Sequence, residues 1–163
     1  PLIVDGGPTP VGVESTIVKV EPERIVLLRP GGVPVEEIEA VADRPVVRAE
    51  GGKVVAPGML ASHYAPDAGV RLDADAVRPG EALLAFGPRR IAGAKAARAV
   101  LNLSETGDLR EASRNLFAFL RQLDHSGAAS IAVEPIPVNG LGEAINDRLA
   151  RAAAPRDIPV SGS

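Results

Sequence analysis

Three hydroxyl-bearing side chains and one guanidinium group could together bind a phosphorylated ligand. Ser15 and Thr16 stand where a proline-rich loop enters an apolar run, Arg29 stands at the end of the next apolar run, and Tyr64 lies in a later, proline-bounded loop beside His63. A guanidinium offers a planar fork of donors that matches phosphate oxygens, and it stays charged at any working pH. Taken alone, each of these residues also has an ordinary structural role, at a strand edge or on the surface. The candidate site consists of Ser15, Thr16, Arg29 and Tyr64.

Other kinds of chemistry are disfavoured by the residue types. The chain has no cysteine and only two histidines, His63 and His125, so a zinc site is not expected. His125 follows a predicted helix, where a histidine favours the helix dipole, and no serine is marked as part of a nucleophilic triad. Gly140-Leu141-Gly142 lies between a strand and a helix, as a dinucleotide-binding loop would, but Ile145 stands where such a loop has its third glycine. A helix entry is the simpler interpretation of that segment.

Composition is typical of a globular protein. The 163 residues are 45% hydrophobic and 24% charged, and 17 glycines with 15 prolines predict many turns and at least one linker. The net charge of −3 argues against direct binding of nucleic acid. No run is long enough to span a membrane and no signal peptide is visible, so a cytoplasmic location is expected. Because the first residue, Pro1, is not an initiator methionine, we expect a piece of a longer chain.

In the first third of the chain, short β-branched runs alternate with glycine and proline. This pattern predicts strands over 2–4, 15–20 and 25–28. Apolar residues at positions 35, 38 and 41 suit a short helix over 35–41. Periodicity then fades, and glycine and proline punctuate the chain up to about residue 69. We interpret that stretch, which holds Tyr64, as a linker.

Beyond residue 70, strands and helices alternate. Strands are predicted over 82–86, 99–103 and 130–133, together with a last helix over 141–154. Asp108 opens another helix that ends near residue 124, because Glu111 three residues later completes a capping box. Strands separated by helices of this length imply parallel crossovers. The fold class is therefore α/β, with a small Rossmann-like parallel sheet in this half of the chain.

Several motifs that follow one another in a fixed order favour a ligand-binding role for the candidate site over a purely structural one. They are Asp5-Gly6-Gly7 followed by Gly12-Val13-Glu14-Ser15-Thr16-Ile17-Val18, then Leu27-Leu28-Arg29-Pro30-Gly31, then Ala56-Pro57-Gly58-Met59 with His63-Tyr64-Ala65-Pro66, and finally Gly142-Glu143-Ala144-Ile145-Asn146-Asp147-Arg148-Leu149. Their combination covers almost the whole chain, and it resembles the two-domain L-threonylcarbamoyladenylate synthases.

The resemblance implies an α/β fold in which residues 1–49 form the C-terminal end of a YrdC-like catalytic domain. Residues 50–69 would be the interdomain linker, and residues 70–163 the Rossmann-like C-terminal domain. The family's lysine- and arginine-rich motif and its serine-asparagine motif belong to the first domain and are absent from this sequence. We therefore expect the C-terminal portion of such an enzyme, inactive by itself.

The family condenses ATP, L-threonine and bicarbonate into threonylcarbamoyl-AMP and pyrophosphate, an adenylyl transfer that serves the t6A modification of adenosine 37 in tRNA. The resemblance thus implies ATP with Mg²⁺, threonine and bicarbonate, with the t6A transfer machinery as a downstream partner. By motif, Arg29 would hold ATP phosphates, Ser15 and Thr16 would line the ATP and threonine sites, and Tyr64 would contact the nucleotide when the linker closes. No residue of this chain is assigned as a catalytic group or metal ligand, and contact of the second domain with tRNA stays open.

Two rival functions are also considered. One is a non-catalytic regulatory or interaction module, in which the Rossmann-like half binds a partner or senses a ligand. The other is a dinucleotide-dependent oxidoreductase that uses Gly140-Leu141-Gly142. Binding of a partner by the Rossmann-like half would favour the first, and binding of a nicotinamide dinucleotide the second.

Overall fold

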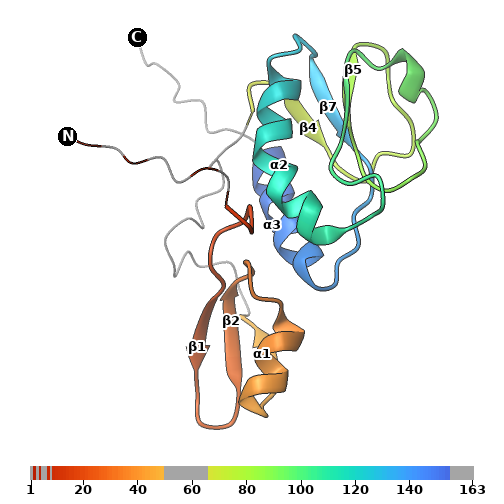
Figure 1. Cartoon of the computed structure of the whole chain (residues 1–163). Coiled ribbons are helices and arrows are strands. Elements are labelled where there is room, and N and C mark those ends of the chain that lie inside the picture. The colour runs from red at the N-terminus through yellow and green to blue at the C-terminus, as the bar shows by residue number, and fades with distance from the viewer. Residues whose placement is uncertain (1, 3, 5–6, 8, 50–65, 155–163) are drawn as a thin grey trace, which may run out of the picture.

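The computed structural model of the protein describes residues 2, 4, 7, 9–49 and 66–154, which form two units (Figure 1). The small unit, residues 15–49, holds a three-stranded sheet, and the large unit, residues 66–154, holds a four-stranded sheet. The connecting segment, residues 9–14, runs from the large unit into the small one. No helix in these described ranges has both the length and the apolar character needed to cross a membrane.

The small unit is built on an antiparallel pair with one parallel strand added. Strands β1 (Ile17–Val20) and β2 (Ile25–Arg29) are antiparallel, and β3 (Val46–Arg48) pairs parallel to β2 after helix α1 (Val35–Ala42). Ile25 and Leu27, which alternate along β2, pack with Val46 against the inner face of α1. The strands over 15–20 and 25–28 and the helix over 35–41 are confirmed to within two residues, whereas β3 was not foreseen. The expected strand over 2–4 includes a residue outside the described part of the chain.

All four strands of the large unit are parallel. They are β4 (Gly69–Arg71), β5 (Glu81–Ala85), β6 (Val100–Asn102) and β7 (Ser130–Val133), in the order β4-β7-β5-β6. Helix α2 (Leu109–Asp124) connects β6 to β7, and α3 (Leu141–Ala153) follows β7. The α/β class and the parallel sheet are therefore confirmed.

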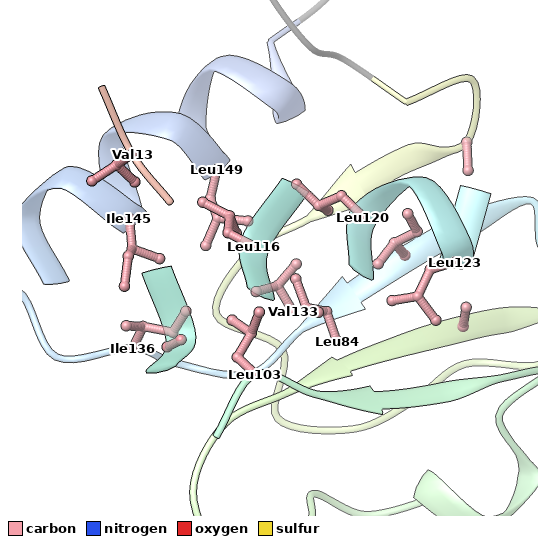
Figure 2. Packing of buried hydrophobic residues seen from close by; sticks show 14 of the residues in the cluster. Val13, Leu84, Leu103, Leu116, Leu120, Leu123, Val133, Ile136, Ile145 and Leu149 are labelled. Carbon is pink, nitrogen blue, oxygen red and sulfur yellow. The ribbon is translucent and has the colours of Figure 1, made fainter. Parts of the chain in front are cut away.

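Both long helices cover the same face of the large sheet. Side chains of α2 and α3 pack with Leu84 and Val133 in one cluster, part of which is shown in Figure 2. The opposite face, which includes Leu83 and Ala132, is covered by residues 72–80 and 87–99, where the 3-10 turn η1 (Ala94–Ala96) is the only helical element. The sheet is thus flanked by helices on one side and by irregular segments on the other, unlike a doubly wound sheet.

Helix α2 begins at the Asp108 cap that the sequence predicts, but the Asp108 amide bonds to Ser104 and not to the Glu111 side chain as a capping box requires. The Asp108 carboxylate accepts a hydrogen bond from the Glu111 amide at 2.8 Å. The Ser104 hydroxyl closes the cap, because it donates to the Glu111 carboxylate and accepts from the Asp108 amide. At the other end His125 caps the helix, and its Nδ1 lies 2.8 Å from the Arg121 carbonyl oxygen. These contacts fix where the helix begins and ends.

A buried carboxylate stabilises the start of β5. Glu81 is 4% exposed and accepts hydrogen bonds from Arg71 Nη2 at 2.6 Å, the Arg78 amide at 2.8 Å and Ser130 Oγ at 3.1 Å. The hydrogen bond from Arg71 is the main reason why the pKa of Glu81 falls from 4.5 to about 2. Its charged form therefore ties β4, β5 and β7 together.

Glu81→Gln is expected to lower the free energy of unfolding at pH 7 by about 2 kcal/mol, because charge-assisted hydrogen bonds to Arg71 are lost. A carboxylate with a depressed folded pKa stabilises above its unfolded pKa and loses that contribution as the pH falls. The difference between wild type and variant should therefore shrink as the pH drops from about 4.5 to about 2. Urea titrations across this range measure it, with the exposed Glu105→Gln as control. A difference that is independent of pH would contradict the assignment.

Candidate functional site

The connecting segment is anchored in the large unit before it enters β1. Val13 is 8% exposed and belongs to the core cluster together with Leu116, Ile145 and Leu149 (Figure 2). A Cβ atom placed on Gly12 would lie 2.1 Å from the carbonyl oxygen of Ser113 in α2. Only glycine allows the chain to approach the helix this closely.

Arg29 and Ser15 lie together, as the candidate site requires. Arg29 Nη2 donates to the Ser15 carbonyl oxygen at 2.8 Å and to Ser15 Oγ at 3.3 Å, and Arg29 Nε donates to the same carbonyl at 3.2 Å. Arg29 is 8% exposed, whereas Ser15 is exposed. The guanidinium therefore lies beneath the strand start and places a positive charge directly behind an accessible hydroxyl.

Thr16 holds the loop that follows β2. Its Oγ1 donates to the Val33 carbonyl oxygen at 2.7 Å and accepts from the Val33 amide at 3.0 Å. Both hydrogen-bonding functions of the hydroxyl are used in this reciprocal contact. Thr16 thus positions backbone in this structure, in addition to any contact with a ligand.

An ion pair between a buried arginine and a partly exposed glutamate joins the same region to α3. Arg148 is 5% exposed, and its Nε donates to Glu14 Oε2 at 2.7 Å, its Nη2 donates to the Pro30 carbonyl oxygen at 3.2 Å and its Nη1 contacts Asp147. Burial raises the pKa of Glu14, but the hydrogen bond and charge of Arg148, with a further contribution from the charge of Arg29, outweigh it and leave the pKa lowered. The pair is therefore charged at neutral pH.

Gly31 explains why the two motif segments can lie against each other. A Cβ at this position would be 2.4 Å from each of three backbone atoms, namely the Glu14 oxygen, the Ser15 carbonyl carbon and the Thr16 nitrogen. The backbones of segments 12–16 and 29–31 are therefore in direct contact. We call this block, made of residues 12–16 and 29–31, the joint.

Three of the four candidate residues are brought together, and two partners were missed. Ser15, Thr16 and Arg29 all belong to the joint, whereas Tyr64 and His63 lie outside the described residues. The missed partners are Glu14 and Arg148. One signal could have revealed Arg148, because it shares the inward arc of α3 with Ile145 and Leu149, where a charged side chain needs a partner.

A cavity of about 520 Å³ lies between the connecting segment and α2. It is lined by Thr9, Val11, Gly12, Val13, Glu14, Pro66, Phe117, Leu120, Arg121 and Asp124. Ser15, Thr16 and Arg29 are not among these residues. The cavity therefore shares only the first part of the joint and lies beside the candidate site.

The segment Gly140-Leu141-Gly142, which could have formed a dinucleotide-binding loop, makes its contacts with other parts of the protein. The Gly140 amide, at the start of α3, donates to Glu36 Oε1 at 3.3 Å, and a Cβ on Gly142 would lie 1.9 Å from the Pro137 carbonyl oxygen. Close packing against Pro137 thus accounts for Gly142. The Glu36 carboxylate lies at the helix start, where a dinucleotide-binding loop would hold the pyrophosphate. The interpretation of Gly140-Leu141-Gly142 as a helix entry agrees with this geometry.

A second carboxylate fills the carboxyl edge of the large sheet. Glu134 follows β7, is 4% exposed and accepts hydrogen bonds from the Phe86 amide at 2.8 Å and the Ile91 amide at 3.0 Å. Arg90 pairs with it at 3.3 Å. Open α/β sheets bind their ligands at this edge. Here an internal anion takes the backbone donors that a phosphate would need.

The joint offers donors and fixed charge. Within the described ranges, no three histidine, cysteine, aspartate or glutamate side chains gather as metal ligands. What the joint presents is a hydroxyl backed by a buried guanidinium on a braced strand start. Such an arrangement suits an anionic or hydroxyl-bearing ligand, because its dipoles and charge are already oriented.

Comparisons with known proteins show that the chain is similar to one family. Residues 33–154 match the family model described as threonylcarbamoyl-AMP synthase, C-terminal domain. The threonylcarbamoyl-AMP synthase of Pyrococcus abyssi (strain GE5 / Orsay) is 38% identical over 184 aligned positions, which cover 97% of this chain and 51% of that protein. The enzyme of the same name from Bacillus subtilis (strain 168) is 35% identical, covering 96% and 49%.

A solved structure agrees with the sequence comparisons. The crystal structure of P. abyssi Sua5 complexed with L-threonine superposes with a TM-score of 0.70 at 34% identity, covering 91% of this chain and 48% of that one. The chain therefore spans about half the length of the relatives it matches.

Proposed function

This chain belongs to the threonylcarbamoyl-AMP synthase family, and from that premise we propose that its residues serve the synthesis of threonylcarbamoyl-AMP. In this reaction the amine of L-threonine and bicarbonate give a carbamate and one molecule of water. A carbamate oxygen then attacks the α-phosphorus of ATP, the bond to the β-phosphate oxygen breaks, and pyrophosphate leaves. The enzyme is thus a nucleotidyltransferase.

The observation that carries this proposal is the contact between Arg29 and Ser15. Negative charge builds on the phosphate oxygens during the transfer, and catalysis needs donors and positive charge that are oriented before the reaction. Arg29 would bind ATP phosphates, and the exposed Ser15 hydroxyl and Thr16 would line the ATP and threonine sites. A relative with 34% identity is described as complexed with L-threonine, which supports this substrate.

Tyr64 completes the proposed site by contacting the nucleotide when the linker closes over it. A closed linker would exclude water from the threonylcarbamoyl-AMP mixed anhydride, which water can hydrolyse. We keep residues 1–49, 50–69 and 70–163 as the proposed YrdC-like part, linker and Rossmann-like domain.

ATP is expected to enter with Mg²⁺ bound to its phosphates, as magnesium is usually held by phosphates and few carboxylates. The described residues offer no metal-ligand group of their own, so no step of the mechanism is derived through the ion. The product would pass to the t6A transfer machinery for tRNA. A cytoplasmic location fits such a role, and bicarbonate completes the set of substrates.

Reconstitution tests the proposal. We expect the chain alone to release no pyrophosphate from ATP, and the chain joined to a YrdC-like half to release it only when threonine and bicarbonate are both present. A coupled pyrophosphate assay measures the rate, and omission of each substrate is the control. A folded fusion protein that releases pyrophosphate at the same rate with and without threonine would overturn the proposal.

One observation favours a second candidate, a non-catalytic interaction module. Glu36 and Glu134 occupy the positions where a Rossmann-like unit would bind a nucleotide, so the large unit itself has another use. The same assay separates the candidates. A YrdC-like half that reaches the full rate without residues 70–163 would favour the module.

A further inference from the structure

Helix α3 forms one ion pair with the small unit and a second, of contrasting character, with the connecting segment. Arg48 of β3 and Glu143 form an exposed bidentate pair, with distances of 2.7 and 2.9 Å, and the Arg48 side chain is 62% exposed. In the other pair the Arg148 side chain is 4% exposed and its partner Glu14 is 35% exposed. Exposed pairs stabilise little, whereas loss of one partner from a buried pair leaves an uncompensated charge. The two pairs therefore contrast an exposed guanidinium with a buried one on the same helix.

The Arg148 guanidinium holds both backbone segments of the joint. Its Nε binds the side chain of Glu14, the residue before Ser15, and its Nη2 binds the carbonyl of Pro30, the residue after Arg29. One planar group thus fixes the neighbours of both proposed ligand-binding residues. A rigid fork keeps two partners at a constant separation, which a flexible ammonium cannot do.

We propose that Arg148, acting through Glu14 and Pro30, is a positioning residue for the Ser15–Arg29 pair. The large unit thereby contributes to substrate binding without touching the substrate. This inference rests on the proposed function of the joint. It assigns a specific task to the C-terminal domain, which is to set the position of the strand start that carries Ser15 and Thr16.

The relevant alternative is that Arg148 only attaches the two units to each other. Attachment alone would make loss of the Arg148 pair more destabilising than loss of the Arg48 pair, but it would leave the kinetics of the folded enzyme unchanged. Positioning of Ser15 and Arg29 depends specifically on the contacts of Arg148 with Glu14 and Pro30. Small displacements of a binding group can lower rates about 100-fold. The two roles therefore predict different kinetics.

The test uses the chain joined to a YrdC-like half. Arg148→Ala is expected to lower kcat/KM for threonine about 100-fold, and Arg148→Lys about 10-fold, because lysine keeps the charge but cannot bind Glu14 and Pro30 together. Arg48→Gln should stay within about twofold of the unaltered protein, since exposed pairs contribute little. Thermal unfolding of each variant shows whether it is folded at the assay temperature.

A double-mutant cycle on Arg29 and Arg148 distinguishes positioning from destabilisation, because destabilisation alone would not make the effects of the two substitutions depend on each other. In an Arg29→Ala background, Arg148→Ala should lower kcat/KM by less than about threefold, because both residues act through the joint. Glu14→Gln, which retains the shape of the side chain, gives a second route if Arg148→Ala does not fold, and it should reproduce the loss of kcat/KM for threonine.

The outcomes separate this inference from the proposed function. If the unaltered fusion protein shows no threonine-dependent pyrophosphate release, the proposed function fails. If it is active and Arg148→Lys and Glu14→Gln behave like Arg48→Gln, the positioning role is wrong while the proposed function stands. Additive effects of the Arg29 and Arg148 substitutions would likewise overturn it.

Discussion

Arg29→Ala is expected to reduce threonine-dependent pyrophosphate release by at least about 100-fold, the usual loss when one oriented donor to a developing charge is removed. Two effects act together. The proposed cation for the phosphates disappears, and the Ser15 carbonyl and hydroxyl lose the donors that hold the strand start. The measurement is kcat/KM for ATP and for threonine in the chain joined to a YrdC-like half.

Two further variants make this result interpretable. Arg29→Lys keeps a cation but not the fork, so it should recover only part of the activity. Lys19→Ala removes another cation from the same hairpin, with a side chain that is 63% exposed, and should leave the rate within about twofold. A folded Arg29→Ala protein with the unaltered rate would remove Arg29 from the site.

Gly31→Ala should destabilise the protein by about 3 kcal/mol, the upper end of what overpacking usually costs. The added methyl group would lie 2.4 Å from backbone atoms of residues 14, 15 and 16, and backbone cannot move aside as a side chain can. Urea unfolding followed by circular dichroism measures the loss. Since these atoms carry the candidate site, activity should fall together with stability.

Gly32→Ala is the matched control for this change. At that position the added methyl would meet Val11 Cγ1 at 3.1 Å, and the half-buried Val11 side chain can shift by a few tenths of an ångström. We expect a loss below about 1 kcal/mol. Equal losses for the two glycines would contradict the close contact between the two backbones at Gly31.

Much of the fold was predictable from local patterns in the sequence. The apolar run that became β5, the Asp108 cap and the spacing along α2 are decided by residues close in sequence, and each was predictable. Strands β3 and β4 are only three residues long, and their extended state comes from pairing with β2 and β7, which lie far along the chain. No local periodicity reports such pairing.

The candidate site shows the same division. A hairpin brings β1 against β2, so the approach of Ser15 to Arg29 follows from neighbouring elements. The partner of Glu14 is 134 positions away on another unit, and no spacing rule predicts it. The placement of both helices on one face also escaped prediction, because the connections over 72–80 and 87–99 have no periodic pattern.

The distance along the chain between Glu14 and Arg148 has a consequence for biosynthesis. Translation proceeds from the N-terminus, so the residue that braces the joint is made 134 positions after the one it binds. Contacts between such distant segments form late, after the elements that carry them have folded. A nascent or truncated polypeptide that lacks α3 would contain Ser15, Thr16 and Arg29 but not the Arg148 contacts that hold Glu14 and Pro30, so the joint reaches its final arrangement only after α3 has been made.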